Sequence, residues 1–141
     1  MSKYKTIVFD IDGTLLNTDL YICLAFLNLF QKYRKEYMPS LKELLSFSGP
    51  TLEDTFEKYF PNVDKKILFD EYERFSKENL KKYTTLYPDE ISVLDELKKR
   101  YHLAICTSRR KDAAIACLKY FDLLKYFELI ISVDDVSKPK P

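Results

Sequence analysis

The spacing of apolar residues changes twice along the chain and divides it into three regions. The first region, residues 4–10 (YKTIVFD), is a short β-branched run ended by Asp and Gly, a pattern typical of a buried strand. The middle region places its apolar residues mainly at helical spacing. The last region alternates short apolar runs with helical segments, so the chain combines two kinds of architecture.

The middle region is predicted to be entirely helical. Its helices are expected at residues 18–37, 41–47, 52–60 and 64–83. The residues NTD at 17–19 offer N-cap side chains for the first helix, and Thr51 offers one for the third. Apolar positions almost encircle the first helix, which indicates that it packs on more than one neighbour.

The last region predicts a parallel sheet. Helices are expected at 91–100 and 111–121, and strands at 101–108 and 127–133. Strands that alternate with helices of this length form βαβ units. The chain is therefore predicted to be an α/β protein with a core of residues 1–16 and 88–141. An all-helical domain, residues 17–87, is inserted after the first strand.

The composition argues against several classes of function. The chain has 141 residues, and its 23 basic residues nearly balance 22 acidic ones, so no overall field favours nucleic acid or an anionic membrane. The most apolar run, residues 20–30, is too short to span a bilayer. Cys23, Cys106 and Cys117 are scattered, without a C-x-x-C motif or a secretory signal, which indicates reduced thiols. These features predict a soluble cytoplasmic protein with no nucleic-acid or membrane partner.

Two carboxylates, Asp10 and Asp12, stand at the carboxyl end of the first predicted strand, where open α/β sheets bind ligands. Carboxylates this close repel each other, and a divalent cation such as Mg²⁺ removes the conflict and favours a phosphate ligand. With one acid as nucleophile and the other moving a proton, the pair suits phosphoryl transfer through an aspartyl-phosphate. Gly13 and Thr14 allow a sharp turn whose N–H groups face bound anions.

Two non-catalytic interpretations of the segment DIDG, residues 10–13, are a polar turn and a calcium-binding loop. An EF-hand loop needs Gly at its sixth position and Glu at its twelfth. Counted from Asp10, these positions hold Leu15 and Tyr21, and a strand precedes the loop in place of a helix. Calcium is therefore excluded, whereas the polar turn stays open on this segment alone.

Two later strand ends carry side chains that suit the same chemistry. Thr107 and Ser108 follow the second strand at the start of a helix, where hydroxyl and N–H groups can hold a phosphate. Lys138 follows the third strand and could neutralise phosphate oxygens. Taken singly, a helix cap and a solvated surface charge explain these residues better. Because parallel strands end at the same edge of a sheet, their order along the chain nevertheless predicts one phosphate site.

The motifs resemble those of the haloacid dehalogenase superfamily, in its phosphoglycolate phosphatase-like branch. DIDGTLLNT at residues 10–18 resembles the first family motif, Thr107 the second, and Lys138 of KPKP the third. The resemblance covers all 141 residues. It implies a Rossmann-like core, incomplete in this chain, with a helical cap inserted after the first motif.

The resemblance also implies a Mg²⁺-dependent phosphatase that acts on a small phosphorylated metabolite or pyrophosphate. Asp10 would be the nucleophile and would bind Mg²⁺. Asp12 would be the general acid/base and would give the metal its backbone carbonyl. Thr107 and Lys138 would hold the phosphoryl group.

The helical insertion carries a further resemblance. FSGPTLEDTF at residues 47–56 is similar to a cap loop that begins with Gly-Pro, here Gly49 and Pro50, and faces the active site. Strand ends common to the sheet recognise only the phosphate. Substrate choice is therefore expected to lie in the insertion, with Gly49 and Pro50 as the contact.

Two features depart from the family pattern. Asn17 stands where many relatives carry an acid. The fourth motif, an acidic cluster that completes the Mg²⁺ site, has no counterpart, and Asp134 and Asp135 precede Lys138 and cannot simply replace it. The chain is therefore expected to be a fragment with weak or no phosphatase activity. It is also expected to form a homodimer through the exposed sheet edge beside the first strand.

Three functions compete on these residues. The first is the phosphatase, and the second is a non-enzymatic remnant that binds phosphate or a protein partner. The third is a phospho-accepting receiver domain, which also uses an Asp, a Thr or Ser and a Lys. A receiver domain has its acidic pair first and its acceptor on the third strand, so the order of the motifs disfavours it.

Overall fold

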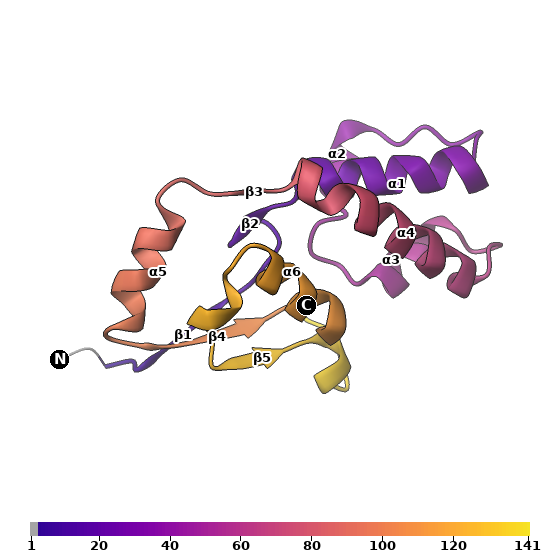
Figure 1. Cartoon of the computed structure of the whole chain (residues 1–141). Coiled ribbons are helices and arrows are strands. Elements are labelled where there is room, and N and C mark those ends of the chain that lie inside the picture. Colours follow the sequence, from indigo (N-terminus) through magenta and orange to yellow (C-terminus); the bar gives the residue numbers. More distant parts are fainter. Residues whose placement is uncertain (1–2) are drawn as a thin grey trace. The chain divides into compact units, whose positions relative to one another are not determined.

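The computed structural model describes residues 3–141, which separate into two compact units. The sheet unit contains the residues up to Leu16 and those from Leu86 onward, and the helical unit contains Asn17–Thr85. The chain thus leaves the sheet unit soon after its first strand and returns to it after the last helix of the insertion (Figure 1). The second boundary lies slightly before the predicted one at residue 87.

Three parallel strands form the sheet of the sheet unit (Figure 1). They are β1 (Thr6–Phe9), β4 (His102–Cys106) and β5 (Leu129–Ile131), in the order β1-β4-β5. Helices α5 (Glu90–Lys98) and α6 (Lys111–Tyr120) and the short 3₁₀ helices η1 (Leu124–Tyr126) and η2 (Val133–Asp135) complete the unit. The α/β class and the parallel sheet predicted from the alternating pattern are confirmed.

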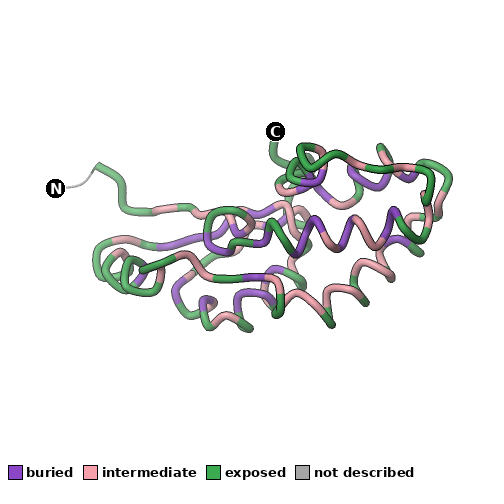
Figure 2. Tube along the Cα trace, turned by 90° about the horizontal axis from the view of Figure 1, so that it is seen from above, coloured by how far each residue is buried: buried purple, intermediate pink, exposed green. Residues whose placement is uncertain are grey.

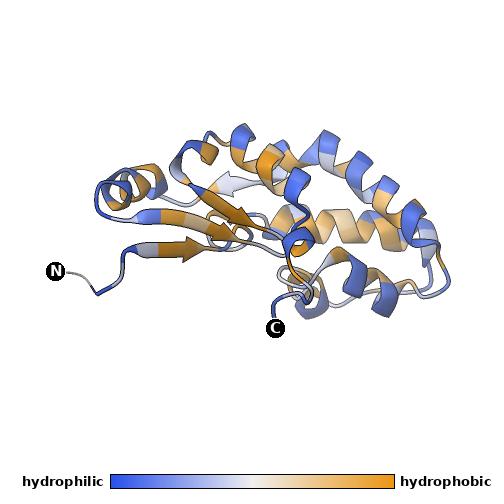
Figure 3. Cartoon of the chain, turned by 90° about the horizontal axis from the view of Figure 1, so that it is seen from below, coloured by the Kyte–Doolittle hydropathy of each residue, from blue (hydrophilic) through white to orange (hydrophobic). Residues whose placement is uncertain are grey.

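The two faces of this sheet differ in burial. Leu103 and Ile105 of β4 are almost fully buried, and α5 and α6 lie over one face of the sheet (Figures 1 and 3). On the other face the strand register aligns Val8, Ala104 and Leu129 in one row, and Val8 is 60% exposed. β1 is therefore a half-exposed edge strand and not the buried strand that its apolar run predicts. A homodimer through this edge remains a prediction.

Four helices form the helical unit. They are α1 (Asp19–Tyr33), α2 (Leu41–Leu45), α3 (Leu52–Tyr59) and α4 (Lys65–Tyr83), and each lies within its predicted range. The Thr51 hydroxyl caps α3 by accepting a hydrogen bond from the Asp54 N–H at 3.1 Å. Ser40 and Glu43 form a reciprocal capping box at α2. These local hydrogen bonds fix where the short helices begin.

The core of the helical unit consists largely of aromatic rings. Phe26, Phe30 and Phe56 are each at most 2% exposed. The ring centroids of Phe26 and Phe47 lie 4.4 Å apart, and those of Phe30 and Phe60 lie 4.7 Å apart. Figure 2 shows buried positions recurring along the helices among exposed ones. The helical unit therefore has a hydrophobic core of its own.

The two chain connections between the units pair with each other. They are β2 (Leu16–Asn17) and β3 (Thr85–Leu86), which form a separate two-stranded sheet. Strands of two residues are too short to show an alternation of apolar and polar residues, so the apolar pattern predicts neither of them.

Beyond β3, Asp89 takes a left-handed backbone conformation, with φ 59°, at the N-terminus of α5.

Candidate active site

Asp10 directly follows β1, at the carboxyl end of the sheet. Its Oδ2 lies 3.2 Å from Lys140 Nζ, and its Oδ1 accepts a hydrogen bond from the Ile11 N–H at 2.7 Å. The Asp10 side chain is 34% exposed. Asp10 is therefore an ion-paired carboxylate that a small ligand can still reach.

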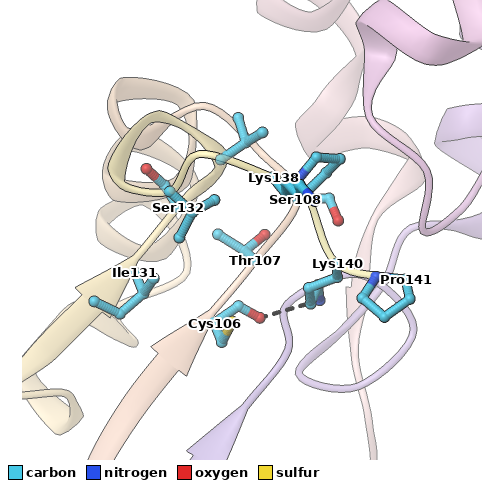
Figure 4. A pocket seen from close by; sticks show the side chains of 11 residues that line it. Cys106, Thr107, Ser108, Ile131, Ser132, Lys138, Lys140 and Pro141 are labelled. Atoms are coloured by element: carbon cyan, nitrogen blue, oxygen red, sulfur yellow. Dashed lines mark hydrogen bonds between the residues drawn. The ribbon is translucent and has the colours of Figure 1, made fainter.

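Lys140 connects the ends of two strands. Besides lying next to Asp10, its Nζ donates a hydrogen bond to the carbonyl oxygen of Cys106, the last residue of β4, at 3.2 Å (Figure 4). The sequence motifs predict Lys138 at this position, but the lysine that contacts Asp10 stands two residues later. In an extended segment, residues two apart face the same side, so the repeat KPKP alone does not distinguish the two lysines.

A cavity of about 240 Å³ lies beside these residues, within the sheet unit (Figure 4). Thr107 and Ser108 line it from the end of β4, and Lys138 and Lys140 line it from the segment after η2. Three of the predicted phosphate-binding residues, Thr107, Ser108 and Lys138, therefore line one cavity together with Lys140.

Thr107 is held with its hydroxyl ready to donate. It is 3% exposed, and its N–H donates to the carbonyl oxygen of Ile131 on β5 at 2.9 Å. Its Oγ1 accepts a hydrogen bond from the backbone N–H of Arg109 at 3.1 Å. Because one lone pair is used in this way, the hydroxyl proton is left for an anionic oxygen.

Asp12 faces a different cation. Its Oδ2 accepts a hydrogen bond from Arg109 Nε at 2.8 Å and its Oδ1 accepts one from Arg109 Nη2 at 2.7 Å. The two side chains are 14% and 15% exposed. This is the paired, fork-like geometry that makes arginine–carboxylate contacts strong and directional.

The electrostatic repulsion that the spacing of Asp10 and Asp12 suggests is thus offset in the structure. Asp10 pairs with Lys140 and Asp12 pairs with Arg109, so each carboxylate has its own cation. A divalent ion between the two is not needed to offset their repulsion. The cations come from distant parts of the chain, and the spacing of the acids gives no sign of them.

The turn after Asp12 uses its amides internally. Gly13 has φ 75°, in the left-handed region, and its N–H donates to the Leu16 carbonyl oxygen at 2.9 Å. The Thr14 N–H donates to the Ile11 carbonyl oxygen at 3.2 Å. The sharp turn is therefore present, but these two N–H groups close the turn and do not face a bound anion as predicted.

Asp134 and Asp135 are engaged at the start of α6. Asp134 Oδ2 accepts from the Lys111 N–H at 2.8 Å, and Asp135 Oδ1 pairs with Lys111 Nζ at 2.7 Å. This lysine, together with hydrogen bonds from Ser132, lowers the pKa of the Asp135 carboxyl to about 2. Both acids therefore stabilise the loop after β5.

Few side chains are available to bind a metal ion, and they offer oxygen atoms, which are hard donors. Within residues 3–141, no group of three or more His, Cys, Asp or Glu side chains is placed to hold a metal. Because Arg109 occupies both carboxylate oxygens of Asp12, the loop offers the Asp10 carboxylate and backbone carbonyls. A small set of oxygen donors suits Mg²⁺, which keeps several water ligands, and does not suit a metal that needs a complete protein cage.

The predicted substrate loop lies in the helical unit, between α2 and α3. Gly49 and Pro50 are both exposed, and Gly49 has φ 121°, a conformation that favours glycine. That this loop faces the active site remains a prediction.

No helix in the described residues is both long and apolar enough to cross a membrane. The three cysteines are free thiols.

The sequence motifs do not indicate two residues of the site, Arg109 and Lys140. The signal for Lys140 is the second lysine of KPKP, and the signal for Arg109 is the pair of arginines that follows Thr107 and Ser108. Both signals are weak, because a basic residue near a helix start or in a terminal loop is usually a solvated charge.

Known proteins match this sequence over nearly its whole length. The sequence pattern of the haloacid dehalogenase-like hydrolases matches residues 7–141. The chain is 33% identical over 141 residues to the pyrophosphatase PpaX of Bacillus pumilus and 31% identical over 141 residues to that of Bacillus cereus. Each alignment covers 99% of this chain and 64% of the relative. The chain therefore spans less than two thirds of the length of these relatives.

A solved structure with the same fold is a haloacid dehalogenase-like hydrolase from Streptococcus pneumoniae. It superposes with a TM-score of 0.80 at 27% sequence identity. The superposition covers 94% of this chain and 62% of the other. The match extends over nearly all of the chain, so it includes both the strands and the inserted helices.

Proposed function

Because this chain belongs to the haloacid dehalogenase-like hydrolase family, we propose that it hydrolyses phosphate esters or pyrophosphate through an aspartyl-phosphate on Asp10. The observation that carries the proposal is the position of Lys140 Nζ, 3.2 Å from both Asp10 Oδ2 and the Cys106 carbonyl oxygen. This contact gathers a carboxylate, a cation and the adjacent buried Thr107 at one edge of a parallel sheet. The similarity to two pyrophosphatases supports the class of substrate.

In the proposed reaction, an Asp10 oxygen attacks the phosphorus atom and the bond to the leaving oxygen breaks. Lys140 and the Thr107 hydroxyl stabilise the negative charge on the phosphoryl oxygens. Asp12 gives a proton to the leaving oxygen. In the second step Asp12 takes a proton from the water that attacks the aspartyl-phosphate, and phosphate leaves as the Asp10 carboxylate is restored.

The donors at the loop also suit a Mg²⁺ ion. The Asp10 carboxylate and the Asp12 backbone carbonyl would hold it, with water and substrate oxygens as further ligands. When bound, the ion would supply Lewis-acid polarisation of the phosphoryl group. Lys138, in the wall of the same cavity, would add positive charge for the substrate.

Substrate choice is assigned to the helical unit. The strand-end residues recognise only the phosphoryl group, which all substrates of this class share. We propose that the exposed loop at Gly49 and Pro50 contacts the rest of a small phosphorylated metabolite. Exchange of residues 47–56 for those of a relative tests this, because it should change the ratio of kcat/KM between two phosphate esters.

A second candidate function is phosphate binding without rapid turnover. It is favoured by the donor set, because no group of three metal-holding side chains is present in the described residues. In this case the cavity lined by Thr107, Lys138 and Lys140 would hold a phosphate ion. Phosphorus NMR of added inorganic phosphate would show binding, while hydrolysis assays would show no turnover.

The test of the primary proposal is the substitution Asp10→Asn. Hydrolysis of p-nitrophenyl phosphate and of pyrophosphate is measured with and without Mg²⁺. Loss of the nucleophile should lower kcat at least ~1,000-fold, while the circular dichroism spectrum stays unchanged. The matched control is Asp70→Asn, an exposed carboxylate of α4 paired with Lys66, which should leave kcat unchanged. Near-native turnover in Asp10→Asn would show that the covalent mechanism is wrong.

A further inference from the structure

The contact between Arg109 and Asp12 ties together two segments far apart in the sequence. Two hydrogen bonds of 2.7 and 2.8 Å connect the guanidinium to the two carboxylate oxygens. Both side chains are about six-sevenths buried, with 15% and 14% of their surface exposed. A surface ion pair would be dispensable, but a shielded, two-point contact restricts how the carboxylate can rotate.

The backbone of Arg109 is itself fixed. Its N–H donates to Thr107 Oγ1 at 3.1 Å, and its carbonyl oxygen accepts from the Val133 N–H at 3.2 Å. α6 begins two residues later, at Lys111. The guanidinium therefore extends from a loop that is tied both to β4 and to the segment after β5. The guanidinium can therefore hold Asp12 in one orientation without a rearrangement of the loop that carries it.

The orientation of Asp12 matters because of what this carboxylate does in the proposed reaction. A group that passes a proton to a leaving oxygen must keep one oxygen directed at that atom. Without Arg109, the Asp12 side chain would lose the contact that fixes its two oxygens.

We propose that Arg109 is a positioning residue that holds the Asp12 carboxylate in line for proton transfer to the leaving group. The inference rests on the proposed function. In the step concerned, the Asp10–phosphorus bond forms, the bond from phosphorus to the ester oxygen breaks, and the proton of Asp12 moves to that oxygen. Arg109 contacts neither phosphorus nor the ester oxygen in this step and acts through Asp12.

The leaving group separates this role from a structural one. p-Nitrophenolate departs without a proton, whereas the alkoxide of glycerol 2-phosphate needs one. The quantity to compare is kcat/KM, because it covers the steps up to departure of the leaving group and excludes hydrolysis of the aspartyl-phosphate. Arg109→Ala should lower kcat/KM for glycerol 2-phosphate about 30-fold or more, and for p-nitrophenyl phosphate less than about 3-fold.

Three further variants complete the experiment. Arg109→Lys, which keeps the charge but not the two-point contact, should recover only part of the loss on glycerol 2-phosphate. Asp12→Ala should show the same dependence on the leaving group, and adding Arg109→Ala to it should cause no further loss. Arg110→Ala, which removes the same charge at the neighbouring position, should leave kcat/KM unchanged for both esters.

The outcomes distinguish the inference from the proposed function. Equal losses on the two esters, or additive losses in the Asp12 and Arg109 double variant, would overturn the positioning role while leaving the phosphatase proposal intact. No hydrolysis of either ester by the unsubstituted chain would overturn the proposed function, and the positioning role with it.

Discussion

The helical unit and the sheet unit both place carboxylates against cations, but they surround them differently. In the helical unit, Glu71 of α4 accepts hydrogen bonds from Asn28, Lys32 and Arg74 at 2.6 to 2.7 Å and is 11% exposed. In the sheet unit, Asp10 has one cation near one of its oxygens and is 34% exposed. The first carboxylate is enclosed by donors from two helices, and the second is more accessible to another partner.

This difference indicates how a structural charge is told from a functional one. The hydrogen bond from Arg74, followed by those from Lys32 and Asn28, lowers the pKa of Glu71 to about 2, and the two donors of α1, Lys32 and Asn28, join that helix to α4. Such a group stabilises packing and is shielded from a ligand. Asp10, directly after β1, belongs to the opposite kind, because a nucleophile requires an accessible lone pair.

The largest expected effect on folding comes from the aromatic core of the helical unit. Phe56 is 0% exposed and packs edge-on against Phe69 with ring centroids 5.0 Å apart. Phe56→Ala should lower the free energy of unfolding by about 3 to 4 kcal/mol, because it leaves a cavity among rings that cannot close over it. Urea unfolding followed by circular dichroism measures the loss.

The control for this variant is Leu41→Ala, on the surface of α2. Leu41 is 69% exposed, so its removal should change the free energy of unfolding by less than about 0.5 kcal/mol. A loss below ~1.5 kcal/mol in Phe56→Ala would mean that the helical unit does not depend on its aromatic core.

A smaller effect is expected from the enclosed carboxylate, Glu71. Glu71→Gln removes the charge that Arg74 and Lys32 face, and it should lower the free energy of unfolding by roughly 1 to 2 kcal/mol at pH 7. The folded-state pKa of about 2 lies below the ordinary value of 4.5. The contribution of Glu71 is therefore complete above pH 4.5 and is lost as the pH falls toward 2.

Unfolding measured at several pH values tests both parts of this expectation. The difference between the unsubstituted chain and Glu71→Gln should shrink steadily below pH 4.5. Glu73→Gln, on the same helix but 66% exposed and paired with Lys77, is the matched control and should have little effect at any pH. A difference that does not depend on pH would show that the charge of Glu71 is not responsible.

The smallest effect concerns the backbone of the sheet unit. Asp89 has φ 59° and makes no side-chain hydrogen bond that caps α5. Asp89→Gly should raise the free energy of unfolding by about 0.5 kcal/mol, because glycine adopts this conformation without steric strain. Asp89→Ala, measured by the same urea titration, should lower it. Stabilisation by Ala would show that the left-handed conformation is not retained in solution.

The sequence predicts the elements of this molecule better than the contacts among them. The helical ranges follow from apolar periodicity, and the N-cap at Thr51 follows from its local chemistry, since both depend on residues close together in the chain. The exposure of β1 could not be predicted in the same way. It depends on which elements cover the sheet, and Val8 has the same sequence context whether or not its face is covered.

In the candidate site, too, the sequence predicts what depends on local spacing and does not predict contacts between distant residues. Asp10, Asp12 and Thr107 were identified because their spacing relative to strand ends is visible in the sequence. Their cations, Arg109 and Lys140, were not, because the pairing of Asp12 with Arg109 spans 97 positions and is decided by how the loops meet. Long flexible cations reach partners that no local pattern records.

The pairing of β2 with β3 bears on the order in which the chain folds. Val8 pairs with Ala104 across the whole helical unit, Asn17–Thr85, and closing a disordered loop of that length costs about 4 kcal/mol in chain entropy. Once the helical unit has formed around its own aromatic core, Asn17 and Thr85 are already close together. β1 then meets β4 across residues 10–16 and 86–101 alone, so formation of the inserted helices is expected to speed the assembly of the sheet and, with it, of the catalytic edge.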